Sequence, residues 1–196
     1  MNIIAFAFFI SAMPGVPISK NETACPYDEE AFLALGIDSF DQNRDKGWRR
    51  LASRSECRAE AANLIEVYRR YVESRLTSLY WHEGQLRAEL GQTELAISAL
   101  EKARHVNNLD GWNYYVDATV AFLRQQKPAL LKARANLAAV PVPKNYKSIG
   151  LDGKLITGRP QGWPYNLDVV DGFINCFGKA YSEAYSLNCR AEGKSN

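Results

Sequence analysis

Histidine is scarce in this sequence, and cysteine pairs with metal-binding spacing are missing. Only His82 and His105 are present, and none of the four cysteines forms a Cys-x-x-Cys pair. The segment HEGQL begins at His82 but has Leu86 where the zinc motif HExxH needs its second histidine. Nucleophile elbows, phosphate loops and dinucleotide fingerprints are also missing. The sequence therefore predicts no metal site and no cofactor.

Blocks of like charge and long apolar runs are missing too. Lys and Arg number 24 and Asp and Glu 22, and they are interspersed, so nucleic acid is not an expected partner. No apolar run is long enough to cross a bilayer, so no stable membrane insertion is expected after processing. With 196 residues, 46% of them hydrophobic, the chain is long enough for one domain with a real core.

An uncharged apolar run, MNIIAFAFFISAM, opens the chain and is followed by Pro14, Gly15 and Pro17. Its length is that of the apolar region of a signal peptide, although no Lys or Arg precedes it. We expect residues 1–19 to be a signal peptide, cleaved after Ala12 or around Ser19, and residues 20–196 to form one exported domain, periplasmic or extracellular. The alternative is a short buried helix.

The four cysteines are even in number, which in an exported chain indicates two disulfides. Three connectivities are open, and we favour the local pairs Cys25–Cys57 and Cys176–Cys189. The alternative is four buried thiols in a cytosolic protein.

Residues 28–140 show an almost entirely helical pattern. Helices are expected within residues 28–35, 41–53, 55–74, 75–90, 93–106, 110–126 and 128–140. Ser55 with a nearby acid is a capping pattern, and Pro128 suits the first turn of a helix. The connections are short, so neighbouring helices should form antiparallel hairpins.

A period of about 34 residues relates these helices. Ala61, Ile65 and Tyr68 recur 35 residues later as Ala96, Leu100 and Ala103, and Gly84 recurs as Ala118. Because small residues at these positions would let two helices approach closely, the helix containing Gly84 should pack on the one that follows.

The order of small residues Gly84, Gly91, Ala96, Leu100 and Ala103 resembles the tetratricopeptide repeat over residues 58–141, with Ala118 and Pro141 matching in the next unit. Glu83 and Arg87 depart from the family pattern, and Gln125 or Gln126 replaces the turn glycine. The resemblance implies an all-α, short solenoid of helical hairpins with the generic fold of that family.

Residues 141–164 hold four prolines and four glycines and predict a long loop. Within it, Asp152-Gly153 is a hairpin signal. Helix should resume over 165–189 as a C-terminal cap of the solenoid, with Asn166 as its N-cap. We expect this loop, anchored by Trp163, to run across a face of the helices.

The resemblance also implies a concave binding face for an extended peptide or a sugar. Its residues would be Trp81, Gln85, Glu89, Trp112, Tyr115, Thr119 and Phe122. Repeat equivalence places Trp81 beside Tyr115 and Glu83 beside Asp117. The alternative is that these aromatic rings are buried under the 141–164 loop.

Glu83 and Asp117 fall where a helix normally packs inward, so we expect a structural ion-pair cluster with Arg87 and Arg124. The catalytic alternative is a carboxylate pair, with His82 as proton donor, in an envelope hydrolase of cell-wall sugars. The function that the sequence favours is an exported protein- or peptide-binding scaffold and not an enzyme. A structural assembly factor without a ligand cleft is the third alternative.

Overall fold

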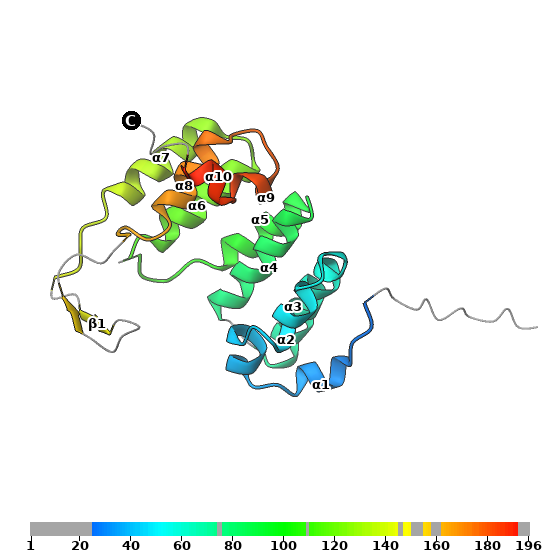
Figure 1. Ribbon diagram of the computed structural model, residues 1–196. Coiled ribbons are helices and arrows are strands. Elements are labelled where there is room, and N and C mark those ends of the chain that lie inside the picture. Colours follow the sequence, from blue (N-terminus) through cyan, green and yellow to red (C-terminus); the bar gives the residue numbers. More distant parts are fainter. Residues whose placement is uncertain are drawn as a thin grey trace, which may run out of the picture.

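The computed structural model describes residues 25–73, 76–108, 110–144, 147–149, 155–157 and 162–191, and Figure 1 shows their arrangement. The predicted signal segment lies outside the described residues. Within them the protein is helical apart from one two-stranded hairpin. The helices are α1 (Glu29–Leu33), the π-helical turn η1 (Asp38–Gln42), α2 (Gly47–Ala52), the 3-10 turn η2 (Ser55–Cys57), α3 (Arg58–Tyr71), α4 (Thr77–Glu89), α5 (Thr93–Lys102), α6 (Trp112–Leu123), α7 (Lys127–Ala138), α8 (Leu167–Asn175), α9 (Tyr181–Ala184) and α10 (Leu187–Ala191).

Two tight helical hairpins, α4–α5 and α6–α7, form the middle of the molecule. Each turn has the same hydrogen bonds: Gln92 N to Arg87 O at 2.9 Å in the first, and Gln126 N to Ala121 O at 2.9 Å in the second. This is the Schellman arrangement, which needs a left-handed residue after the helix. Gly91 supplies it in the first turn with φ 71°, and Gln125 supplies it in the second with φ 55°. Gln125 thus stands where the turn glycine was expected.

Gly84 lies where α4 presses on α5. A Cβ atom at this position would lie 2.6 Å from Leu100 Cγ and 3.2 Å from Ala96 O. The predicted close approach of these two helices is therefore confirmed, and Gly84 is small because no side chain fits.

The positions related by the 34–35-residue period are buried alike. Ala61, Ile65 and Tyr68 on α3 are at most 1% exposed, as are their counterparts Ala96, Leu100 and Ala103, and Ala118 is fully buried. The packed helices are compatible with a helical repeat fold. The predicted cap at Ser55 is wrong: α3 begins at Arg58 after η2, and the Ser55 hydroxyl bonds the Glu56 carboxylate instead.

Helix α4 is shared by two hydrophobic cores, which explains why its apolar residues do not form a single stripe. Leu79 and Leu86 join an N-terminal core with α2 and α3, whereas Trp81 and Ala88 join a larger core that extends to α10. Figure 1 shows α1–α3 at one end of the molecule and α4 between them and the remaining helices.

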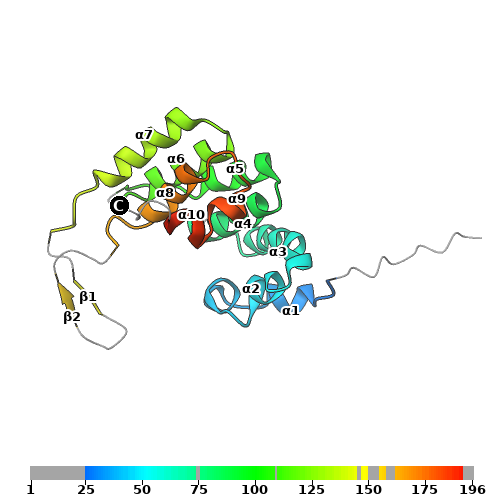
Figure 2. The same ribbon diagram turned by 45° about the horizontal axis from the view of Figure 1, so that its top comes forward.

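The predicted single capping helix over 165–189 is instead three short helices. The chain breaks after α8, near Gly178 with φ 89°, and the segment then folds back so that α8 and α10 lie together. Asn166 occupies the N-cap position of α8, but it has φ 64° and makes no side-chain cap bond. Figure 2 shows α8 beside α6 and α9 near α4.

The loop of residues 141–164 contains the expected hairpin. Strands β1 (Lys147–Ile149) and β2 (Leu155–Thr157) are antiparallel, with Lys147 opposite Thr157. The Asp152-Gly153 tip lies outside the described residues. Buried Trp163 donates its indole N–H to Val140 O at 3.1 Å, which holds the two ends of the loop together. The strands lie away from the helices in Figures 1 and 2, and the path of the loop across the helices stays a prediction.

The favoured disulfides are both present. Cys25 pairs with Cys57, and Cys176 pairs with Cys189, at Cα separations of 5.5 and 5.8 Å. One joins the chain before α1 to the start of α3, and the other joins the end of α8 to α10. None of the described helices is both long and apolar enough to cross a membrane.

Candidate functional site

The aromatic residues of the predicted binding face do lie together. The ring of Trp81 on α4 is 4.7 Å from those of Tyr115 and Trp112 on α6, measured between centroids. The predicted neighbours Trp81 and Tyr115 are thus confirmed. Trp112 is fixed further, because its indole N–H donates to Ala103 O at 2.7 Å and its ring stacks on His105. These contacts join consecutive helical hairpins.

This aromatic face is not open, because the chain's own C-terminal helices fill it. Phe173 of α8 stacks on Phe122 with centroids 4.8 Å apart, and Tyr181 of α9 packs against both rings. Burial raises the pKa of the Tyr115 and Tyr181 hydroxyls, so both stay protonated at any ordinary pH. The cover is made by α8 and α9 rather than by the 141–164 loop.

The seven residues of the predicted binding face therefore differ in their exposure to solvent. Glu89 is exposed, Gln85 and Trp112 are half-buried, and Trp81, Tyr115, Thr119 and Phe122 are buried. The Thr119 hydroxyl bonds Tyr115 O within its own helix and is fully buried. Ligand binding by these residues stays a prediction, but four of them are not accessible in this structure.

Glu83 and Asp117 are ion-paired, although not with the predicted partners. Glu83 contacts Arg69 at 2.7 Å, and Asp117 contacts Arg104 at 2.7 Å. The expected partner Arg87 instead bonds Asn63 and Gln92.

Arg124, the other expected partner, pairs with Glu101. These ion pairs join residues on different helices. The i,i+4 rule used in the sequence analysis considers only pairs within one helix, so it could not predict them. Like Arg69–Glu83 and Arg104–Asp117, the pair Arg134–Asp171, at 2.9 Å, links an arginine to an acid of the following helix and joins α7 to α8. Helix α8 thus meets α7 as the first helix of a further hairpin would.

The two acids are poorly placed to act as a catalytic pair. Glu83 is 6% exposed and held by the Arg69 guanidinium, which itself stacks on the Tyr80 ring. Asp117 is far more accessible and borders a shallow groove between α5, α6 and α7. One acid therefore lies in the protein interior and the other on its outer surface.

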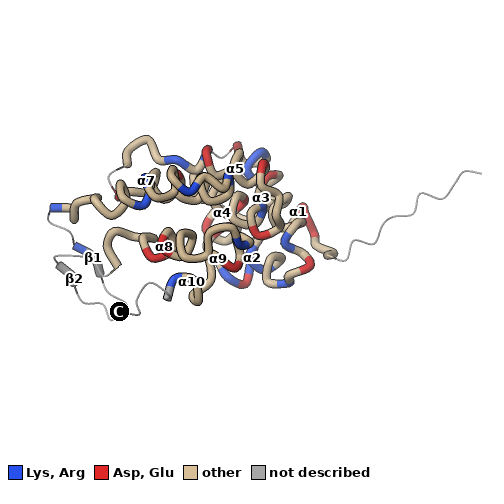
Figure 3. The backbone as a smooth tube through the Cα atoms, turned by 90° about the horizontal axis from the view of Figure 1, so that it is seen from above, with Lys and Arg blue, Asp and Glu red and all other residues tan. Residues whose placement is uncertain are grey.

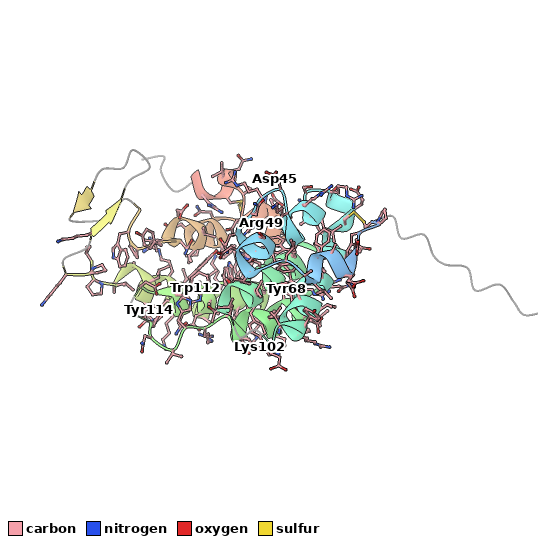
Figure 4. All side chains as sticks on the ribbon, turned by 90° about the horizontal axis from the view of Figure 1, so that it is seen from below. Asp45, Arg49, Tyr68, Lys102, Trp112 and Tyr114 are labelled. Atoms are coloured by element: carbon pink, nitrogen blue, oxygen red, sulfur yellow. A yellow bond between two sulfur atoms is a disulfide. The ribbon has the colours of Figure 1, made fainter. Side chains whose placement is uncertain are left out.

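His82 belongs to a buried polar network that sequence reasoning missed. Its Nδ1 lies 2.7 Å from Asp41 Oδ1, and its Nε2 lies 3.3 Å from Arg49 Nη2. In the neutral ring, Nε2 accepts from Arg49, which can only donate, and Nδ1 donates its proton to Asp41; in the protonated ring, the positive charge of His82 also lies beside the Asp41 carboxylate. Trp48 Nε1 also donates to Asp41, at 3.0 Å. Arg49, on α2, is labelled in Figure 4.

The charge of Asp41 is stabilised by this network. Burial acts to raise its pKa, but hydrogen bonds from His82, Trp48 and Ser78, together with the charge of His82, lower the pKa to about 2. Both ring nitrogens of His82 are occupied, so the ring is not available as a proton donor to a ligand. The network ties the N-terminal helices to α4. Sequence analysis did not find this network because Asp41 and His82 are 41 residues apart in the chain.

A surface groove lies at the N-terminal end of the molecule, between α1 and α2. It has a volume of about 610 Å³, within the range of ligand-binding clefts. Its lining combines the apolar Phe32 and Leu51 with the guanidinium groups of Arg50 and Arg54. Neither arginine was singled out in the sequence, because no motif marks them.

Among the described residues, no group of three or more His, Cys, Asp or Glu side chains could hold a metal ion. Basic and acidic residues are interspersed over the helices, as Figure 3 shows. Comparisons of the chain with protein-family models, with curated proteins and with solved structures find no match.

Proposed function

We propose that the protein is an exported, tetratricopeptide-like scaffold module that binds a protein partner through its outer surface. The observation that carries this proposal is the filled aromatic face: Phe173 and Tyr181 pack on Phe122, one of the residues that were predicted to bind a ligand. A partner must then use the exposed surface.

Three features support the tetratricopeptide-like part of the proposal. The two helical hairpins have equivalent turns at Gly91 and Gln125. Gly84 and Ala118 are buried at equivalent positions of successive hairpins. An arginine pairs with an acid of the next helix at the α3–α4, α5–α6 and α7–α8 junctions.

Export is supported by the two disulfides, which form and persist in oxidising compartments. A structural assembly factor without a ligand cleft remains the second candidate, and the same filled face favours it. The hydrolase has less support, because Glu83 is buried against Arg69 instead of facing a cleft.

The test is affinity capture with the oxidised, folded chain. The immobilised protein is incubated with envelope and secreted fractions of the native cells, and soluble protein is added as competitor. We expect a stoichiometric partner that soluble protein displaces. If all fractions yield no displaceable protein, the scaffold proposal fails.

A further inference from the structure

The groove between α1 and α2 is lined by both apolar and basic residues. Leu51 forms part of its lining and is only 3% exposed, while Tyr27 and Phe32 pack edge to face with ring centroids 5.7 Å apart. Arg50 and Arg54 are both exposed and line the same groove. A ligand here would meet apolar rings and two cations together.

Arg50 and Arg54 differ from most other described arginines because neither forms an ion pair with a described acid. Among the described residues, acidic partners are found within 4.0 Å for Arg58, Arg69, Arg70, Arg87, Arg104, Arg124, Arg134 and Arg190. Arg50 and Arg54 have no such partner in the described part of the chain. Guanidinium groups bind carboxylates well, with two parallel hydrogen bonds where geometry allows. Within the described residues, no ion pair therefore neutralises these two charges.

The one acid among the described lining residues, Asp28, offsets only part of this charge, because the lining holds two arginines and one carboxylate. Asp28 Oδ1 accepts the Ala31 backbone N–H at 3.0 Å as the N-cap of α1, so this carboxylate is already engaged by its own helix. The groove thus has a net positive lining beside apolar side chains.

We propose that this groove binds an acidic peptide segment of a partner protein. Carboxylates of the segment contact Arg50 and Arg54, and an apolar or aromatic side chain packs on Phe32 and Leu51. This inference rests on the proposed scaffold function and assigns it a surface. The contacts are exposed, so binding weakens as salt concentration rises.

The test selects peptides from a phage-displayed library of random eight-residue sequences on the folded, oxidised protein. We expect selected peptides to be enriched in Asp and Glu together with aromatic residues. Arg50→Glu/Arg54→Glu should weaken a selected peptide by at least about tenfold in anisotropy titrations, since two charge contacts are lost and reversed. Arg50→Gln/Arg54→Gln should have a smaller effect in the same direction.

The matched control is Arg44→Glu/Lys46→Glu, which changes the net charge equally at two exposed cations outside the groove. Affinity within about twofold of the parent is expected for this variant. The inference is overturned if no peptide is selected, if selected peptides carry no acidic excess, or if both charge-reversed pairs weaken binding equally.

Affinity capture separates the two proposals. If the Arg50→Glu/Arg54→Glu variant captures the displaceable partner as well as the parent does, the proposed scaffold function stands. In that case this groove is not the binding site.

Discussion

Replacing Gly84 tests the close approach of α4 and α5 most sharply. Alanine would place its Cβ 2.6 Å from Leu100 Cγ and 2.8 Å from Leu100 Cδ2. Leu100 is fully buried, and the next nearest atom, Ala96 O, belongs to the backbone at 3.2 Å. The conflict therefore cannot be relieved by turning a free side-chain end into solvent, and the two helices must shift apart.

The expected magnitude combines two opposing terms. Overpacking a core costs about 1–3 kcal/mol, whereas alanine in place of glycine inside a helix gains about 1 kcal/mol. We expect Gly84→Ala to lose up to about 2 kcal/mol of unfolding free energy, because the overpacking term is the larger. Gly84→Leu adds three more carbons with no further helix gain, so it should lose more than Gly84→Ala.

The assay is urea unfolding of the oxidised protein, with Gly36→Ala as the matched control. A Cβ atom at Gly36 would meet nothing within 4 Å, and its φ lies outside the left-handed region, so alanine there should be neutral or slightly stabilising. A Gly84→Leu protein as stable as the parent would refute the packing.

A double-mutant cycle with Leu100→Ala removes the atoms that cause the conflict. Leu100→Ala alone leaves a cavity and should cost about 2–5 kcal/mol. Combined with Gly84→Ala, the loss should be at least about 0.5 kcal/mol smaller than the sum of the single losses. Simple additivity would show that Gly84 does not contact Leu100.

Three further predictions concern the disulfides, the buried network and the hairpin turns. Protein purified without reductant and then unfolded should contain no thiol that reacts with maleimide, and two or more reactive thiols would contradict the pairing. Reduction of each disulfide should lower the unfolding free energy by about 3 kcal/mol. The pKa of Asp41 is lowered to about 2, so its ionised form contributes stability that is present above its unfolded pKa and is lost as pH falls towards about 2. The difference in unfolding free energy between the parent and Asp41→Asn should therefore shrink from about pH 5 to about pH 2. A constant difference would show that the ionisation of Asp41 does not contribute to stability. Gly91→Ala should lower the melting temperature through about 1 kcal/mol of left-handed strain, while Gln125→Gly should hold or raise it; shifts of the same sign would mean that the two turns are not equivalent.

Local patterns in the sequence predicted most of the helices and their pairing. The 34–35-residue period correctly related Ala61 to Ala96 and Gly84 to Ala118, because the related positions are buried in successive helices. Local spacing also favoured the two disulfides that the structure contains, although three connectivities were open. These features depend on neighbours in the chain or on a regular period, both of which can be read from a sequence.

Long-range contacts could not be predicted in the same way. Asp41 and His82 are 41 residues apart and share no motif, so their network was invisible. The filling of the aromatic face required knowing that the chain turns after α8, near Gly178, and returns to place Tyr181 against Phe173. The apolar pattern of residues 165–189 indicated burial without showing which surface it would cover.

Hydrogen exchange of the free, oxidised protein tests the filled aromatic face most directly. The account predicts that backbone amides within α8, and the Tyr185 amide that bonds Tyr181 O at 2.8 Å, exchange as slowly as those of α6, since all belong to one core. If the amides of α8–α10 exchange about 100-fold or more faster than those of α6, the C-terminal helices open independently, and the face around Tyr115 and Phe122 is accessible to a partner after all.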